Sequence, residues 1–230
     1  MDQMKHLDLV NSEKPHVLLE SLEDPEMSDE KRHHLKKVLR IEVGSLVTAT
    51  DGKGRWALFD YAGGFLEAAS EIFFVSKPSS PVTIAFSLTK SGKPDFTIQK
   101  LTELGVDRIV VFPAENSVPL WDLSKLKKKQ RRYSSISRSA LEQSKGVWLP
   151  DLAYVNSFAE VAKIKSMCIA DIEGEPINES HNSLAIGPEG GWSTGEYGFR
   201  LPRVSLHRNV LRSETAAVAA AAVLTTLNKS

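Results

Sequence analysis

Hydrophobic and polar positions follow two patterns along the chain, and the first covers residues 1–76. Short apolar runs there are separated by turn signals, among them Asp51-Gly52 and Gly63-Gly64, whose residues tolerate positive φ. Leu35 and Leu39 recur at helical spacing and predict one helix. The predicted strands are 7–10, 16–19, 45–50, 55–61 and 66–74, and the helix is 28–40, begun by Ser28 or Asp29. We therefore expect a small five-stranded β-barrel with one helix.

The second pattern begins at Val82, where short apolar runs alternate with helical segments. The runs predict strands at 82–88, 108–112, 167–170, 184–186 and 204–206, and helices at 96–104, 124–144 and 214–227. Asp95 is the expected cap before the first helix and Gly105 follows it, while Ser193 and Glu196 have capping-box spacing. This alternation indicates an α/β domain with a mostly parallel sheet covered on both faces.

A segment rich in proline and serine, residues 76–81, separates the two patterns. Such composition is typical of a linker, so we expect one domain at 1–76 and a second at 77–230.

Composition narrows the class of protein. Basic and acidic residues balance at 29 each, and no apolar stretch approaches the roughly 18 residues that span a bilayer. Charged residues lie among the first ten, where a signal peptide would be apolar. The one cysteine, Cys168, lies in an apolar run typical of a buried strand, and the adjacent His33 and His34 lack metal-ligand spacing. We expect a soluble, cytoplasmic protein with no membrane segment and no metal.

A glycine-rich loop is the most informative local feature. Residues 186–193, IGPEGGWS, join an apolar strand to a capped helix, and such a loop lets backbone approach a ligand at the carboxyl end of a parallel strand. The loop lacks the phosphate-binding patterns GxGxxG and GxxxxGK[ST]. From spacing alone, a tight turn without ligand is an equally good interpretation.

A second loop, residues 206–216, has the same place between a strand and a helix. Ser213 is the expected N-cap, and Glu214 lies in a first turn that favours acidic side chains. The following helix consists almost entirely of small residues, so another part of the chain can pack close against it.

Several ordered motifs together resemble a known family. GPEGG after an apolar strand, LRSETA about twenty residues later and TIQKLTELGV at 97–106 are similar to the ribosomal RNA small subunit methyltransferase E family. ALEQS at 140–144 and HLKKVLR at 34–40 resemble two further blocks. The resemblance covers nearly the whole chain. It implies an N-terminal PUA-like barrel, a C-terminal SPOUT domain with a trefoil knot, and a homodimer.

The same resemblance implies the chemistry. The expected reaction is methylation of uridine N3 in 16S ribosomal RNA of the 30S subunit, with S-adenosyl-L-methionine as cofactor. Arg212 would offset charge that develops on the uracil, and Glu189 or Glu214 would accept the N3 proton or orient the loops. The residues expected to bind the cofactor are Ile186, Gly187, Pro188, Glu189, Gly190, Gly191, Leu206, His207, Asn209, Val210 and Leu211.

Five residues depart from the family pattern. The chain has Asn116 and Asn209 where the family usually has arginine, His207 where it has glycine, and Lys145-Gly146 where it has Gly-Arg. These departures leave two alternatives open: a SPOUT methyltransferase with another RNA target, and a non-catalytic RNA-binding relative that assists ribosome assembly.

Basic residues cluster in two predicted helices, and such clusters can bind an RNA backbone. An ordinary solvated helix face is the simpler interpretation of each cluster. The candidate RNA-binding residues are Lys31, Arg32, Lys36, Lys37, Arg40, Lys127, Lys128, Arg131, Arg132, Arg138 and Lys145.

Overall fold

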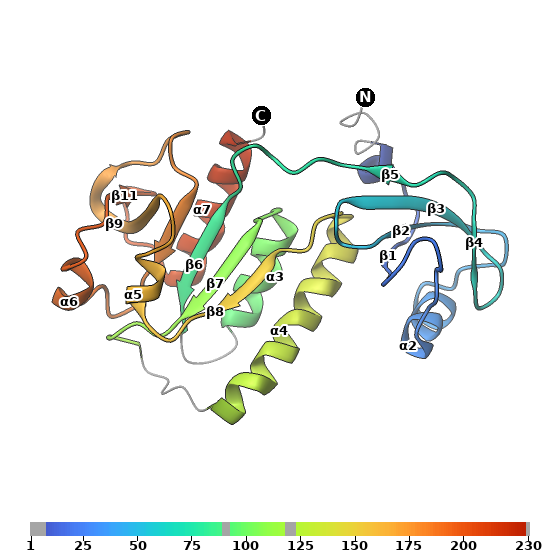
Figure 1. The fold of residues 1–230 in the computed structure, drawn as a ribbon, viewed down its shortest axis with the longest axis horizontal. Coiled ribbons are helices and arrows are strands. Elements are labelled where there is room, and N and C mark those ends of the chain that lie inside the picture. The colour runs from blue at the N-terminus through green and yellow to red at the C-terminus, as the bar shows by residue number, and fades with distance from the viewer. Residues whose placement is uncertain (1–7, 89–92, 118–122, 229–230) are drawn as a thin grey trace. The chain divides into compact units, whose positions relative to one another are not determined.

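The structure is a computed structural model that describes residues 8–88, 93–117 and 123–228, without the side chains of 123–127. The chain divides into two compact units, which are described separately (Figure 1). The first contains Met1–Lys77 and Arg138–Leu149, and the second contains Pro78–Ser137 and Pro150–Ser230. The long helix α4 (Leu123–Ser144) therefore contributes residues to both units.

The first unit is built on a five-stranded sheet. Its strands are β1 (His16–Leu18), β2 (Leu46–Thr50), β3 (Arg55–Tyr61), β4 (Leu66–Ala68) and β5 (Phe73–Phe74). They follow the order β1-β2-β3-β4, with β5 also paired to β3, and only β1 and β2 run parallel. Leu35, Val47 and Phe59 lie in its buried core. The predicted helix forms as α2 (Asp29–His33), capped by Ser28, followed directly by the π-helical turn η1 (His34–Val38).

Two strand predictions in this unit were wrong. Residues 8–11 are helical where the strand 7–10 was predicted, and Leu9 is the one buried side chain among them. The run 66–74 is interrupted at Ser70, whose hydroxyl accepts a hydrogen bond from the Leu58 N–H at 2.9 Å. That side chain takes the place of a backbone partner, so β4 and β5 form as separate short strands.

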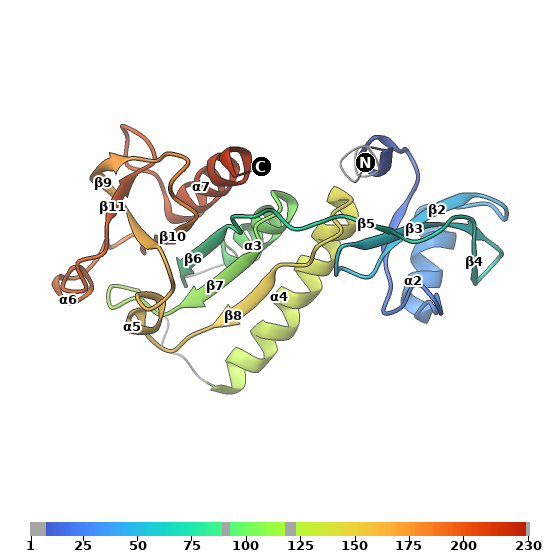
Figure 2. The ribbon, with the colours of Figure 1, turned by 45° about the horizontal axis from the view of Figure 1, so that its top comes forward.

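The second unit is an α/β domain with a parallel sheet, as predicted. Its six strands follow the order β11-β9-β10-β6-β7-β8, and every neighbouring pair is parallel (Figures 1 and 2). The strands are β6 (Thr83–Ser87), β7 (Arg108–Phe112), β8 (Asp151–Tyr154), β9 (Met167–Pro176), β10 (Ser183–Ile186) and β11 (Arg203–Ser205). The chain passes from β8 at one edge to β9 near the other and then returns to place β10 between β9 and β6.

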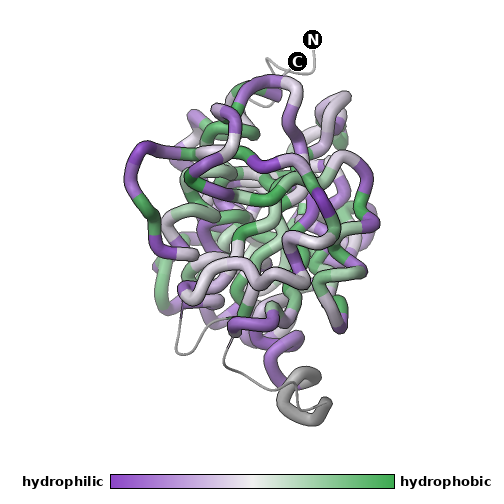
Figure 3. The backbone as a smooth tube through the Cα atoms, turned by 90° about the vertical axis from the view of Figure 1, so that its left-hand side faces the viewer, coloured by the Kyte–Doolittle hydropathy of each residue, from purple (hydrophilic) through white to green (hydrophobic). Residues whose placement is uncertain are grey.

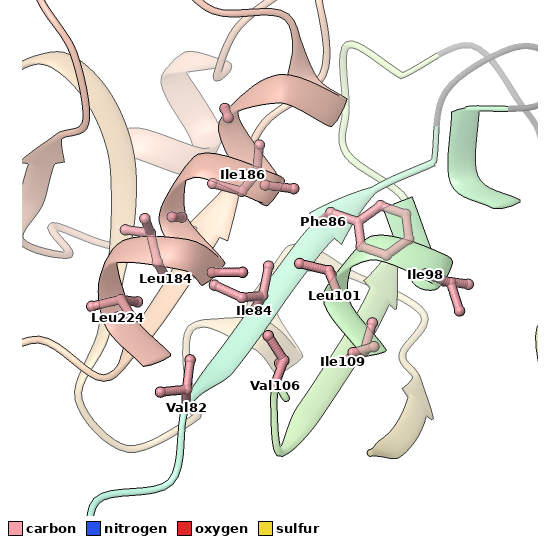
Figure 4. Close-up of a cluster of buried hydrophobic side chains, with 14 of the residues drawn as sticks. Val82, Ile84, Phe86, Ile98, Leu101, Val106, Ile109, Leu184, Ile186 and Leu224 are labelled. Carbon is pink, nitrogen blue, oxygen red and sulfur yellow. The ribbon is translucent and has the colours of Figure 1, made fainter. Parts of the chain in front are cut away.

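Alternating side chains of these strands build a core on each face of the sheet. On one face, Ile84, Ile109 and Leu184 pack against α3 (Lys93–Glu103) and α7 (Ser213–Leu227), as Figure 4 shows. On the other face, Val110 and Ala185 pack with residues of α5 (Phe158–Val161). In Figure 3 the hydrophobic stretches gather inside and hydrophilic stretches form much of the outer loops.

The helix ends correct two predictions and confirm two. Asp95 is the third residue of α3, because the helix begins at Lys93 and tolerates Pro94 in its first turn. Ser213 is the first helical residue of α7, and the preceding Arg212 has the extended conformation of an N-cap. Gly105, with φ of +74°, follows α3 as expected. Ser193 and Glu196 form the predicted capping box of α6 (Thr194–Tyr197).

Candidate active site

A cavity of about 250 Å³ lies in the second unit, where β9 meets the segments that follow β10 and β11. β9 contributes residues 170–172, the glycine-rich loop follows β10, the second loop follows β11, and the first turns of α7 complete the wall. Because β9, β10 and β11 are parallel, the carboxyl ends of β10 and β11 bring their loops to one edge of the sheet.

Most residues predicted to bind the cofactor line this cavity. They are Ile186, Gly187, Pro188, Glu189, Gly191, Leu206, His207, Asn209, Val210 and Leu211. Gly190 is not among the described lining residues, because it faces Asn116: a Cβ at Gly190 would lie 3.1 Å from Asn116 Cβ. The Asn116 side-chain amide donates to the carbonyl of Gly191 at 3.1 Å. This asparagine, a departure from the family pattern, therefore holds the glycine-rich loop.

Trp192 fixes the other side of that loop. Its indole N–H donates to the Ala170 carbonyl at 2.9 Å, which ties the loop to β9. The ring stacks parallel to Phe112 and contacts Phe158. A Cβ added at Gly187 would lie 3.1 Å from the indole, so glycine allows the strand end and the ring to approach closely. Gly191 has φ of +72°, the conformation that lets the chain turn into α6.

The cavity also contains residues that the sequence patterns did not predict. These are Ala170, Asp171, Ile172, Tyr197, Ser213 and Ala216, and Trp192 of the glycine-rich loop also lines the cavity. Asp171 accepts from the Tyr197 hydroxyl at 2.8 Å, and its side chain is 6% exposed. Burial raises its pKa, but the backbone N–H of Glu173, the Tyr197 hydroxyl and Arg203 together outweigh burial and lower the pKa. A position directly after a predicted parallel strand was the signal available for Asp171.

The three predicted catalytic residues occupy different places. Glu189 lines the cavity, and its side chain is 47% exposed. Glu214 lies behind the lining in the first turn of α7, and its Oε2 is buried without a hydrogen-bond partner among the described residues. Arg212 is exposed and is not among the described lining residues, although its charge helps to lower the pKa of Glu189.

The predicted RNA-binding residues divide by whether an acidic partner neutralises them. Lys31 pairs with Glu142 at 3.0 Å, Arg138 with Glu20 at 2.8 Å and Arg32 with Asp29 at 2.9 Å. Arg132 pairs with Asp95, and Lys145 donates to Ser12. Within the described residues, those exposed without an ion pair are Lys36, Lys37, Arg40, Lys128 and Arg131. The Lys127 side chain lies outside the described residues.

The described part of the chain holds no group of three or more His, Cys, Asp or Glu side chains arranged to bind a metal ion. None of its helices is long and apolar enough to cross a membrane. Cys168 is buried as a free thiol, and burial raises its pKa.

A family model described as an RNA methyltransferase domain matches residues 76–225. The chain belongs to this RNA methyltransferase family. A second model, described as an RNA methyltransferase PUA domain, matches residues 28–63 of the same methyltransferase. The resemblance drawn from the sequence motifs is therefore confirmed, and so is the expectation of an enzyme.

Named relatives of this methyltransferase point the same way. Over 220 residues it is 29% identical to the ribosomal RNA small subunit methyltransferase E of Synechocystis, covering 86% of this chain and 71% of the relative. It is 28% identical to the protein of that name in Mycobacterium tuberculosis, covering 81% of this chain and 80% of the relative.

Two solved structures share the fold along nearly the whole chain. A Legionella pneumophila protein described as a methyltransferase, solved with the bound cofactor SAM, is 25% identical and superposes with a TM-score of 0.81, covering 94% of this methyltransferase and 98% of that chain. The small subunit methyltransferase E of Neisseria gonorrhoeae, bound to S-adenosyl methionine, is 25% identical with a TM-score of 0.75, covering 93% and 98%.

Proposed function

We propose that this enzyme transfers a methyl group from S-adenosyl-L-methionine to uridine N3 in 16S ribosomal RNA of the 30S subunit. The observation that carries the proposal is the cavity at which the loops after β10 and β11 meet. The two relatives solved with S-adenosylmethionine support the cofactor, and the names of the curated relatives support ribosomal RNA of the small subunit as the substrate.

The cavity suits a ligand of this chemistry. Ile186, Leu206 and Val210 give it apolar walls for an adenine ring. S-adenosylmethionine also carries a sulfonium and an ammonium group against one carboxylate, so its net charge is positive. Asp171 and Glu189, whose pKa values are both lowered, add two carboxylates to the lining. The residues that line the cavity therefore fit a cation with an aromatic part.

The cofactor supplies an electrophilic methyl carbon, and the protein must manage the proton on the attacking nitrogen. Uracil N3 carries a hydrogen whose loss leaves negative charge on the ring. Arg212, at the N-cap of α7, would offset that charge. Glu189 is the predicted catalytic carboxylate that lines the cavity.

We also propose the finer architecture that the family implies. A PUA-like barrel would occupy residues 1–76, and a SPOUT domain with a trefoil knot would occupy 77–230. Two copies would pair as a homodimer in the cytoplasm.

Transfer of tritiated methyl from S-adenosylmethionine to 30S subunits lacking native methylation tests the function, followed by nucleoside analysis of the product. We expect N3-methyluridine at a single site. A different methylated nucleoside would show that the enzyme modifies another position of the RNA. Cofactor binding without transfer to subunits or free RNA would identify the protein as a non-catalytic relative.

A further inference from the structure

Lys93, the first residue of α3, contacts a carboxylate from each cavity loop. Its Nζ donates to Glu189 Oε1 at 2.8 Å and lies 3.6 Å from Glu214 Oε2. Glu189 follows β10 and Glu214 belongs to the first turn of α7, so one ammonium group joins three separate segments. No sequence pattern singled out this lysine as part of the site.

The three side chains become more buried in order. Glu189 is 47% exposed, Lys93 is 31% exposed and Glu214 is 17% exposed. The innermost atom, Glu214 Oε2, is buried and accepts no hydrogen bond from the described residues. A buried carboxylate oxygen without hydrogen bonds is costly unless a cation offsets its charge. The Lys93 ammonium is positioned to do this.

We propose that Lys93 is a positioning residue for the methyl transfer: Glu214 anchors its ammonium group from the interior, and the ammonium group holds Glu189 at the cavity. This inference rests on the proposed function. Glu214 then acts through Lys93 rather than on the substrate, and Glu189 is the carboxylate presented to the ligands. The arrangement follows the logic of catalytic triads, in which a buried charge orients the group in front of it.

The electrostatics agree with this geometry. The charged groups here are Lys93 from α3, Glu189 from the glycine-rich loop, and Arg212 and Glu214 from the start of α7. The hydrogen bond from Lys93 is the main cause of the lowered pKa of Glu189, and the charge of Arg212 adds to it. The hydrogen bond to Glu189 is likewise the main reason that the pKa of Lys93 is raised. Removal of the ammonium group should therefore raise the pKa of Glu189.

The test compares Lys93→Met and Lys93→Arg with Lys100→Met. Lys100 is a matched control because it lies on the same helix, is 34% exposed and pairs with Glu103 at 2.7 Å. Carbon NMR of the glutamate carboxyls in the free protein, assigned with Glu189→Gln, measures the pKa of Glu189 without any substrate. We expect Lys93→Met to raise that pKa, and Lys93→Arg and Lys100→Met to leave it close to its original value.

Methyl transfer provides the second measurement. Lys93→Met should lower kcat by about tenfold, change KM for RNA little and move the acidic limb of the pH profile to higher pH. Lys93→Arg should recover most of the activity. Circular dichroism checks that each variant folds.

Two outcomes separate the claims. An unchanged Glu189 titration in folded Lys93→Met overturns the role of Lys93, whatever the reaction is. A wild-type protein that transfers no methyl group to RNA overturns the proposed function, while the titration still decides whether Lys93 controls Glu189.

Discussion

At the scale of single residues, Asp171 shows how a buried carboxylate stays charged beside the cavity. Three donors surround it: the Glu173 N–H at 2.9 Å, the Tyr197 hydroxyl at 2.8 Å and Arg203 Nη1 at 3.5 Å. Arg203 is shared with Glu173 at 3.2 Å, so one cation faces two carboxylates. The cluster therefore keeps net negative charge next to the space where we propose that a cationic cofactor binds.

Asp171→Asn should lower the free energy of unfolding by about 2 kcal/mol at neutral pH, because charged acceptors form the stronger hydrogen bonds. The folded pKa of Asp171 is lowered, so its stabilising contribution is complete above the unfolded pKa of about 3.9 and is lost as the pH falls toward the folded value. Urea unfolding at neutral pH and at about pH 3 measures the difference.

We expect the gap between wild type and Asp171→Asn to be largest at neutral pH and to narrow in acid. Glu175→Gln, at an exposed carboxylate of the same strand, is the control. An equal gap at both pH values would show that Asp171 contributes through packing rather than through its charge.

Local signals in the sequence located the two cavity loops, because glycine, proline and small residues mark tight turns wherever they occur. They could not find Lys93, whose partner Glu189 lies 96 positions away and whose role depends on tertiary contact.

The surroundings of the residues that depart from the family pattern are likewise visible only in the structure. His207 and Asn209 depart together, and the Asn209 N–H donates to His207 Nδ1 at 3.1 Å. At Gly146, a Cβ would lie 2.6 Å from Leu141 Cδ1.

At the scale of elements, the short helix α6 is fixed by a single buried glutamate. Glu196 is 2% exposed, and its carboxylate accepts from the Ser193 N–H at 2.8 Å and from the Glu115 N–H at 3.1 Å. Ser193 Oγ accepts in turn from the Glu196 N–H at 3.0 Å. This carboxylate therefore joins α6 to the segment after β7, while Tyr197 of the same helix lines the cavity.

Glu196→Ala should lower the free energy of unfolding by about 2 kcal/mol, because it removes half of the capping box and leaves the Glu115 N–H without its acceptor. The change should also weaken the binding of S-adenosylmethionine, since Trp192, just before the N-cap, and Tyr197, the last residue of the helix, both line the cavity. Chemical denaturation and calorimetric titration measure the two effects. The control Glu179→Ala, at an exposed glutamate, should change neither the stability nor the affinity for the cofactor. If Glu196→Ala also leaves the stability unchanged, α6 does not depend on this cap.

The elements that sequence patterns missed are those with weak hydrophobic signals. β8 is an edge strand in which no side chain is fully buried, and its short apolar run, Leu152-Ala153-Tyr154, is not assigned to a strand by periodicity alone. The four-residue helix α5 is too short for a helical period to emerge. By contrast, β6 and β10 are buried at every position and β7 at every position after Arg108, and the continuous apolar runs typical of parallel sheets predicted each of them.

At the scale of the whole molecule, neither strand order nor charge distribution follows from periodicity. The placement of β10 between β9 and β6 brings the glycine-rich loop close to the second loop. Before the structure, only the resemblance to a family implied that these two loops form one site. The zero net charge conceals a division: many basic side chains are neutralised locally, whereas Lys36, Lys37, Arg40, Lys128 and Arg131 are exposed without an ion pair among the described residues. These five are the stronger candidates for RNA contact, and Lys36, Lys37 and Arg40 lie close enough in the chain to be tested as one group.

Replacement of Lys36, Lys37 and Arg40 by glutamine should weaken RNA binding chiefly at low salt. Each phosphate contact releases counterions and adds about 0.7 to 0.9 to the slope of log affinity against log salt concentration, so the slope should fall by about 2. Fluorescence anisotropy with a fragment of small-subunit ribosomal RNA measures the slope. Arg32→Gln with Arg138→Gln is the control, because Asp29 and Glu20 already neutralise those charges. If the control pair reduces the slope as much as the triple variant, local ion pairing does not decide which basic residues meet the RNA.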